Sequence, residues 1–270
     1  MKSFKHHLYM ALWNLYNKKY PVPHPSEYAD KRIKIMVFNH FDCTLPSCFN
    51  DRSIYIPLRC GNALNPTHDK TFLGDDTGDN ISSFNPLVNE MTGIYWTAKN
   101  YDKIGDPDFI GFNHYRRYLQ WHPSVLRDNV LISTSHLLRR PLRNDYLFVN
   151  DEITELLISR FKKDFPEYST FDAYWKSHTA YYSNLFISDR KTFFRYAGFI
   201  ERMIRWTFVL NAANTIDLTK LSPYHKRVYG FMLEHLTSFW IFNERHSGRI
   251  RHITTRADEF NIPNLINGAR

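Results

Sequence analysis

Two short apolar segments, each ending in polar and charged side chains, define the predicted sheet. Residues 32–40 (RIKIMVFNH) and 108–119 (DFIGFNHYRRYL) are rich in β-branched and aromatic types, which is typical of buried strands. A third strand is expected within 180–189 (AYYSNLFISD), where it introduces Asn184. In open α/β sheets, ligands bind at the carboxyl ends of strands. We therefore expect a functional site where these segments leave the core, at Asn39, His40, His114, Arg116 and Arg117.

The helical spacing of apolar residues predicts four longer helices between and after these strands. Residues 85–101 place Pro86 in a first turn, and residues 150–164 begin with a capping Asn-Asp pair. Two further helices are expected at about 190–211 and 222–243. Strands that alternate with helices indicate an α/β fold. We expect one domain with a small central sheet and an N-terminal extension.

The N-terminal extension combines an amphipathic helix with a proline-rich linker. Residues 1–20 place aromatic and aliphatic side chains near one face and lysines at both ends, but the apolar run is shorter than the roughly 20 residues that span a bilayer. Such a helix either packs on its own domain or lies in an anionic membrane interface. We predict an extension at 1–30, the main domain at 31–256 and a C-terminal tail at 257–270.

The charge balance favours an anionic partner. The 270 residues include 35 Lys and Arg against 27 Asp and Glu, which gives a formal net charge of +8. Nucleotides, phospholipid surfaces and nucleic acid all fit this balance, although the sequence has no fold signature of a nucleic-acid-binding module. The three cysteines form neither a regular disulfide framework nor a zinc-binding pattern, which favours reduced thiols in a cytoplasmic protein.

Several common catalytic motifs are missing from the sequence. It contains no G-x-x-x-x-G-K-[ST], G-x-G-x-x-G, G-x-S-x-G or H-E-x-x-H, which argues against the ATPases, dinucleotide enzymes, hydrolases and zinc proteases that carry them. Arg116 and Arg117 could bind a diphosphate, because guanidinium N–H groups match phosphate oxygens, or form surface ion pairs. His114 could be a base, a phosphate ligand or a buried structural histidine.

Carboxylates in two settings are the remaining candidates. Asp75, Asp76 and Asp79 lie in a turn-rich segment, where they could bind Mg²⁺ or Mn²⁺, contact sugar hydroxyls or face solvent. Glu90 and Glu234 lie in apolar helical segments. A carboxylate in such a segment is either paired with a cation or held with a raised pKa for proton transfer.

Five blocks in a fixed order resemble a bacterial family of glycosyltransferases encoded in capsule, O-antigen and exopolysaccharide loci, the domain of unknown function 4422 type. The blocks are LGDDTGDNIS (73–82), NEMTGIYW (89–96), FIGFNHYRRYL (109–119), SNLFISD (183–189) and KRVYGFMLEHLTSFWI (226–241). The resemblance covers roughly residues 33–245 and leaves the N-terminal helix outside. One departure is His235, which stands where the family has an arginine.

The resemblance implies a GT-A-like fold, in which a central mixed sheet is flanked by helices. It also implies transfer of a sugar from a nucleotide-sugar donor, a UDP-hexose such as UDP-galactose or UDP-galactofuranose, to a lipid-linked surface polysaccharide. A cytoplasmic enzyme at the periphery of the membrane fits this role. The alternatives are a non-catalytic glycan-binding or assembly-scaffold protein and, less favoured, a nucleic-acid-binding module.

The resemblance also suggests roles by position. Many GT-A enzymes hold a metal with D-x-D at a strand end where this chain has His114 to Arg117. We predict that the two arginines, with His114 or Tyr118, offset the charge of the leaving diphosphate, so that no cofactor is required. The alternative is Mg²⁺ or Mn²⁺ at the aspartates, which are Asp75, Asp76 and Asp79.

Glu234 is the predicted general base if the enzyme inverts, and Asp76 or Asp79 is the second choice. A retaining mechanism needs no such base. The donor is expected to contact side chains at the first strand end, in the acidic turn and on the helix that follows it, namely Asn39, His40, Asp76, Asp79, Asn80, Asn89, Glu90, Thr92, Tyr118 and Asn184.

Overall fold

A nine-stranded sheet lies at the centre of the chain, and the predicted strands supply its middle. The computed structural model describes residues 20–138, 140–145 and 149–260. The strand order is β10-β6-β9-β4-β1-β2-β3, and β5 pairs with both β4 and β11 beside this row. The strands are β1 (Ile33–Asn39), β2 (Tyr55–Arg59), β3 (Leu73–Gly74), β4 (Phe109–His114), β5 (Arg117–Leu119), β6 (Val130–Ser133), β9 (Phe186–Asp189), β10 (Arg251–Thr254) and β11 (Ala257–Glu259).

The sheet is mixed. Strand β1 runs parallel to both β2 and β4, and β10 runs parallel to β6. Strand β9 is antiparallel to its two neighbours, β4 and β6. The predicted α/β class with a central mixed sheet flanked by helices is therefore confirmed. One edge of the sheet gathers the carboxyl ends of β1, β2 and β4 together with the start of β9.

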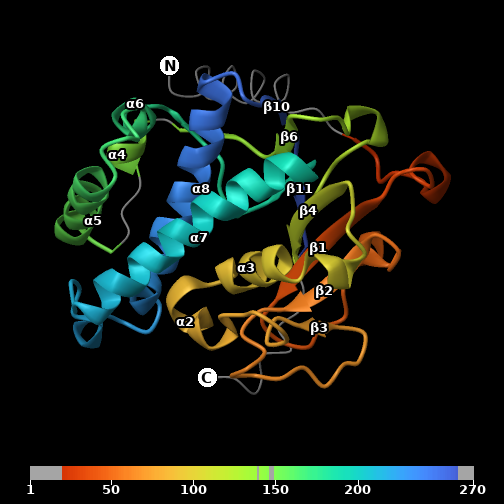
Figure 1. Ribbon diagram of the computed structural model, residues 1–270, viewed down its shortest axis with the longest axis horizontal. Helices are drawn as coiled ribbons and strands as arrows, with labels where there is room; N and C mark the ends of the chain where they lie inside the picture. The colour runs from red at the N-terminus through yellow and green to blue at the C-terminus, as the bar shows by residue number, and fades with distance from the viewer. Residues whose placement is uncertain (1–19, 139, 146–148, 261–270) are drawn as a thin grey trace, which may run out of the picture.

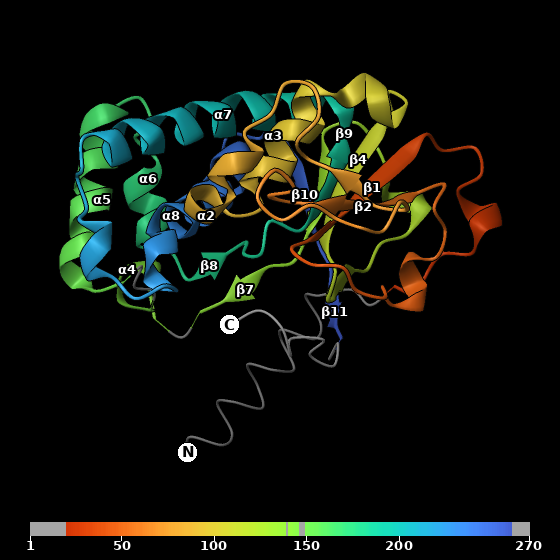
Figure 2. The ribbon, with the colours of Figure 1, turned by 90° about the horizontal axis from the view of Figure 1, so that it is seen from below.

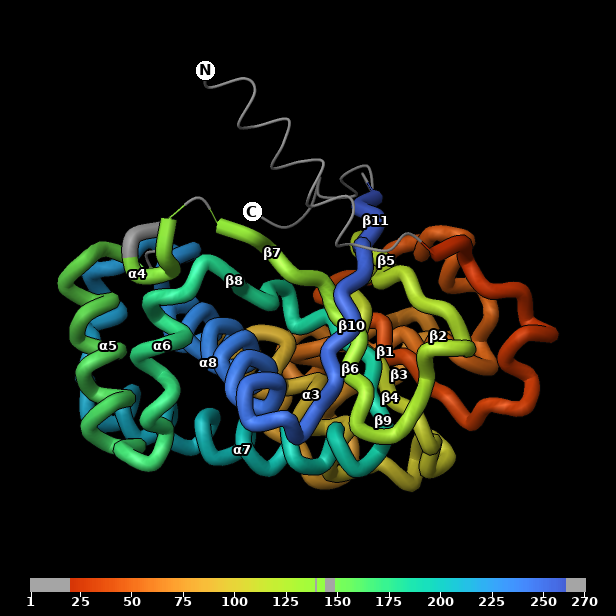
Figure 3. Tube along the Cα trace, turned by 90° about the horizontal axis from the view of Figure 1, so that it is seen from above, coloured from red at the N-terminus to blue at the C-terminus, as the bar shows by residue number. Residues whose placement is uncertain are grey.

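Helices cover one face of the sheet and extend beyond it. They are α2 (Asn85–Val88), α3 (Met91–Lys99), α4 (Leu142–Asp145), α5 (Asp151–Asp164), α6 (Phe171–Trp175), α7 (Arg190–Ala212) and α8 (Val228–His246). In Figures 1 and 2, α3 and α7 lie on the sheet, and α5 and α6 lie at the far end of α7. Figure 3 shows α8 between α6 and the strands. A two-stranded sheet joins β7 (His136–Leu137) to β8 (Thr179–Ala180).

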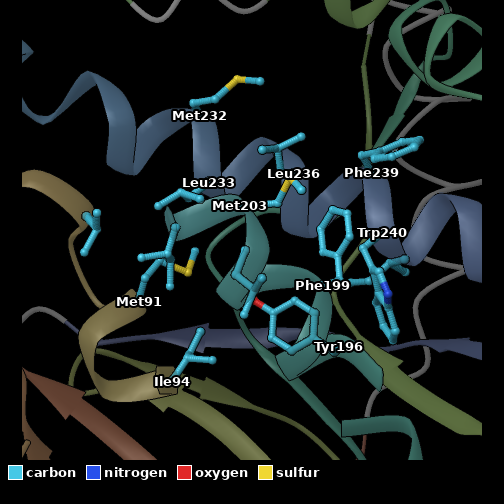
Figure 4. Packing of buried hydrophobic residues seen from close by; sticks show 14 of the residues in the cluster. Met91, Ile94, Tyr196, Phe199, Met203, Met232, Leu233, Leu236, Phe239 and Trp240 are labelled. Atoms are coloured by element: carbon cyan, nitrogen blue, oxygen red, sulfur yellow. The ribbon is translucent and has the colours of Figure 1, made fainter. Parts of the chain in front are cut away.

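The alternation of side chains along the strands builds two cores. Phe38 and Phe112 face the helices, where their ring centroids lie 5.4 Å apart. Figure 4 shows that this core continues through Met91 of α3, Tyr196 of α7 and Leu233 of α8. The opposite face packs against loops, and its buried aromatic residues are Tyr28, Phe49, Tyr55, Phe72, Tyr118 and Trp121.

Several predicted boundaries shift. The predicted helix 85–101 is two helices, because Asn89 has φ 56° and interrupts it. The segment predicted as a linker packs on the domain, since Tyr28 is buried and its hydroxyl donates to Asp51. Strand β11 pairs with β5, so the sheet continues past the predicted end of the domain at residue 256. The predicted helix at residues 1–20 lies, except for residue 20, outside the described residues.

No helix within the described part of the chain is long and apolar enough to cross a membrane.

Candidate functional site

Two histidines stand at the edge of the sheet where β1 and β4 end. The ring centroids of His40 and His114 lie 5.8 Å apart. Burial lowers the pKa of both imidazoles, and the charges of Arg116, Arg117 and Arg227 lower that of His114 further. The neutral form of both rings is therefore favoured. The Nδ1 atom of His114 is buried and has no hydrogen-bond partner among the described residues. A neutral imidazole with a spare ring nitrogen can accept or donate a hydrogen bond to a substrate.

The break between α2 and α3 brings Asn89 and Glu90 to the same edge. Asn89 is buried, and its Oδ1 accepts a hydrogen bond of 2.6 Å from Arg227 Nε at the start of α8. The close approach depends on Gly230, because a Cβ there would lie 2.1 Å from Asn89 Nδ2. Asn89 therefore fixes Arg227, a cation that the sequence did not single out, beside the predicted site.

The residues before β9 form a strained turn that holds two carboxylates. Ser183 and Asn184 have φ values of 74° and 51°, a conformation that costs non-glycine residues about 1–2 kcal/mol each. Ser183 N donates to Glu234 Oε1 at 2.5 Å, and Asn184 Nδ2 donates to Glu90 Oε1 at 3.0 Å. Ser183 Oγ also accepts from Arg117 Nη1 at 2.8 Å. The strain is thus located where three charged side chains meet.

Glu234 has the properties of a general base. It lies on α8, and it is half-buried. Burial, followed by the negative charge of Glu90, raises its pKa to about 7, while the Ser183 N–H and the charges of Arg117 and Arg227 oppose that rise. A carboxylate with a pKa near the working pH is both available and basic enough to accept a proton from a sugar hydroxyl.

The two predicted diphosphate arginines have different surroundings. Arg117 is half-buried, bonded to Ser183 and paired with Glu259 at 2.9 Å. Arg116 is exposed on the turn between β4 and β5, and its guanidinium lies 6.0 Å from the ring centroid of Tyr115. Of the two, Arg117 is therefore the one that contacts the residues around Glu234.

Tyr118, which was predicted to contact the donor, lies in the core instead. It is fully buried on the loop-covered face of the sheet. Its hydroxyl lies 3.0 Å from the Tyr55 hydroxyl, which in turn accepts from Trp121 Nε1 at 3.1 Å. Because its hydroxyl is already hydrogen-bonded within this core, we remove Tyr118 from the predicted donor site. His235, which replaces the family's arginine, is also buried, with its ring edge-on to Trp175 and Tyr182.

The carboxylates of the acidic turn mainly accept hydrogen bonds from neighbouring parts of the chain. Asp75 is buried and accepts from Gly61 N, Asn62 N and the Ser82 hydroxyl. Asp79 is exposed and accepts from Tyr95 on α3 at 3.0 Å. Asn80 Nδ2 donates to the carbonyl of Asp76, and the hydroxyl of Thr92 donates to the carbonyl of Asn89. These contacts give the segment its shape.

The three aspartates do not converge as a metal site would require. Asp75 faces the turn after β2, whereas Asp79 faces α3. Within the described ranges, no group of three or more His, Cys, Asp or Glu side chains is arranged to hold a metal ion. The described carboxylates therefore do not form a preformed three-ligand site, and Mg²⁺ or Mn²⁺ at Asp75, Asp76 and Asp79 stays the alternative prediction.

The family assignment follows from the sequence blocks and the fold together. The model of a domain of unknown function, DUF4422, matches residues 34–159 and 126–245, which together span most of the chain. The chain belongs to the DUF4422 family. No curated protein matches this DUF4422 chain.

A solved structure shows the same fold as this DUF4422 protein. The structure is that of WbbM, described as a bifunctional glycosyltransferase, without ligand, and it superposes with a TM-score of 0.63 at 21% sequence identity. The match covers 85% of the DUF4422 chain and 45% of the WbbM chain, so the chain spans less than half of that relative. At this identity the likeness establishes the architecture, and the chemistry must be argued from the site.

Proposed function

We propose that the protein is a glycosyltransferase that moves a hexose from a UDP-sugar to a hydroxyl of a lipid-linked surface glycan. The observation that carries the proposal is the pair Glu90 and Glu234, held by Asn184 and Ser183 and flanked by Arg117 and Arg227. Sugar transfer needs a base for the acceptor hydroxyl and positive charge for the leaving diphosphate. The edge of the sheet offers both kinds of group.

Glu234 is the proposed base of an inverting reaction. Its carboxylate takes the proton of the acceptor hydroxyl as that oxygen attacks the anomeric carbon, and the bond from that carbon to the diphosphate oxygen breaks. Arg117 and Arg227 offset the charge that develops on the diphosphate, an effect typically worth a few kcal/mol for each donor. His40 and His114, as neutral rings at the strand ends, contribute hydrogen bonds. In this proposal the arginines take the place of a metal ion.

The donor proposal is tested by measuring UDP release from UDP-hexoses, starting with UDP-galactose, in excess EDTA and again with Mn²⁺. Turnover in EDTA is expected. Turnover that depends entirely on Mn²⁺ would contradict the role given to the arginines. Binding of glycan without any release of a nucleotide would instead favour the alternative of a non-catalytic assembly protein.

Arg116 and Arg117 form a matched pair of variants. Arg117→Gln should weaken UDP binding by about tenfold or more, because it removes the guanidinium that is proposed to contact the diphosphate and that Ser183 holds beside Glu234. Arg116→Gln removes the same charge from an exposed turn and should change the dissociation constant by less than threefold. Equal losses in the two variants would mean that general attraction, and not the site, binds the nucleotide.

The lipid-linked acceptor is proposed from the basic charge of +8 and the amphipathic pattern of residues 1–20. Deleting residues 1–20 should release the protein from anionic liposomes and spare turnover on a soluble acceptor. Unchanged liposome binding would contradict a membrane role for this segment.

A further inference from the structure

A row of buried polar side chains lies on the loop-covered face of the sheet, close to the same strand ends. Asn39 of β1 is in register with Arg59 of β2, and Asn113 of the other neighbour, β4, is in register with Val37. All three side chains are buried: Asn39 and Asn113 are 0% exposed, and Arg59 is 2% exposed. All three are near the carboxyl ends of adjacent parallel strands. The proposed catalytic groups do not include Arg59 or Asn113.

Each of these side chains keeps hydrogen-bonding capacity that the described residues leave unused. The atoms without a partner are Asn39 Oδ1, Arg59 Nε, Arg59 Nη1 and Asn113 Nδ2. Native proteins leave few buried polar atoms unsatisfied, so four of them in one row are unusual. A ligand that supplies the missing partners is a direct explanation for such a row.

The chemical type of each free atom is set by the bonds that the rest of the side chain makes. Asn39 Nδ2 donates to the carbonyls of Val37 and Leu58, so its free Oδ1 is an acceptor. Asn113 Oδ1 accepts from Leu119 N at 3.1 Å, so its free Nδ2 is a donor. Arginine has only donors. From β4 through β1 to β2, the row therefore presents donor, acceptor, donor.

The row is also close to electrically neutral. Arg59 Nη2 pairs with Asp42 Oδ1 at 2.5 Å, and Asp42 further accepts from the Thr67 hydroxyl and His68 N. A neutral row that contains an acceptor does not match a phosphate, which presents only acceptors and negative charge. It matches a neutral ligand that has both donors and acceptors.

We propose that Asn39, Arg59 and Asn113 recognise the imide edge of a uracil or thymine base. That edge presents O2, N3–H and O4, which are acceptor, donor and acceptor, and complements the row at all three positions. Cytosine presents donor, acceptor, acceptor, and guanine presents acceptor, donor, donor. Adenine has no third group on the matching edge. Among the common bases, the complementary pattern therefore belongs to uracil and thymine.

This inference rests on the proposed function, because it assigns the base of the same nucleotide-sugar donor. His40, directly after Asn39, senses the charge of Arg59 in the row as well as the charges of Glu90 and Arg227 among the proposed catalytic groups, so the end of β1 is near both. A nucleotide that crosses this strand end reaches both. The free atoms are shielded from solvent, so the proposal requires that their cover opens to admit the base; Asp42 after β1 is part of that cover where it pairs with Arg59.

The test uses the unaltered full-length protein and calorimetric titration with UDP, dTDP, CDP, GDP and N3-methyl-UDP. UDP should bind at least about tenfold more tightly than CDP and N3-methyl-UDP, since each of these mismatches leaves a buried polar group unpaired. N3-methyl-UDP is the sharpest probe, because it differs from UDP only at the donor that faces Asn39. Dissociation constants for CDP or N3-methyl-UDP within threefold of that for UDP would overturn the inference, as would binding of none of the five.

A variant checks the same point. Asn113→Leu should weaken UDP binding by about tenfold, because it removes one of the three hydrogen bonds to the base, and its melting temperature shows whether the chain still folds. Unchanged UDP affinity in the folded variant would overturn the role of Asn113. Turnover of a GDP-hexose or CDP-hexose, with no turnover of UDP-hexoses or dTDP-hexoses, would overturn the base assignment while leaving a glycosyltransferase. Absence of turnover with every nucleotide sugar would defeat the proposed function itself.

Discussion

Replacing Glu90 with glutamine tests whether one carboxylate sets the basicity of the other. Glu90 raises the pKa of Glu234 through its negative charge, which is the largest cause after burial. Glutamine removes the charge but keeps a side-chain oxygen for the hydrogen bond from Asn184 Nδ2. The variant therefore changes the electrostatics of the site with little change in its packing.

The size of the effect follows from the pKa of Glu234. A rise from the ordinary value of 4.5 to about 7 corresponds to about 3 kcal/mol against the ionised form. Burial is the larger cause of this rise in pKa, and a neighbouring like charge typically raises the pKa of a carboxyl group by one unit or more. We expect Glu90→Gln to lower the pKa of Glu234 by about one unit. Because a base must be deprotonated to act, the unaltered enzyme should lose activity as the pH falls through about 7.

The assay is kcat/KM for UDP release from UDP-galactose between pH 5.5 and 9. The acidic limb of the profile should lie near pH 7 in the unaltered enzyme and near pH 6 in Glu90→Gln. The exposed Glu152 on α5 gives a matched control, Glu152→Gln, whose limb should not move. A limb at the same pH in Glu90→Gln and the unaltered enzyme, or a profile that is flat across pH 7, would refute the reasoning.

Two further substitutions test the placement of other residues. Tyr118→Phe removes the hydrogen bond with Tyr55, so it should lower the free energy of unfolding by about 1 kcal/mol in urea denaturation and leave UDP affinity unchanged. A tenfold weaker UDP affinity would return Tyr118 to the donor site. Gly230→Ala puts a Cβ against Asn89 and should lower stability by about 1–3 kcal/mol together with activity, whereas Gly198→Ala on α7, with no atom within 4 Å of the new Cβ, should not be destabilising. Equal stability of the two alanine variants would contradict the close approach of Asn89 to α8 at Gly230.

Local sequence patterns were sufficient to predict the helices and strands in which apolar side chains recur at a clear helical or strand spacing. Strands β1 and β4 and helices α5 and α7 lie where the apolar spacing predicts them. Strand β2 was missed because it is short and contains Pro57, a residue that usually argues against a strand. Strands β6 and β10 have four residues each, too few for an alternation to stand out.

The candidate site was harder to predict, because long-range contacts define it. The polar residues at the predicted strand ends indicated His40 and His114, and the apolar helical segment around Glu234 indicated that carboxylate. The contacts that join Glu234 to Ser183, Glu90 to Asn184 and Asn89 to Arg227 connect residues 51, 94 and 138 positions apart. No local pattern reports such pairs. The same limit explains the error at Tyr118, whose neighbours in a charged block gave no sign that its side chain faces the core.

The most direct test of the central claim is kcat for sugar transfer by Glu234→Gln, measured beside the dissociation constant for UDP. Glutamine can still accept the hydrogen bond from Ser183 N, yet it cannot take a proton from the acceptor. A loss of about 100-fold to 10,000-fold in kcat, with UDP affinity changed by less than threefold, is the predicted result. A variant that keeps more than a third of the original kcat would contradict Glu234 as the base.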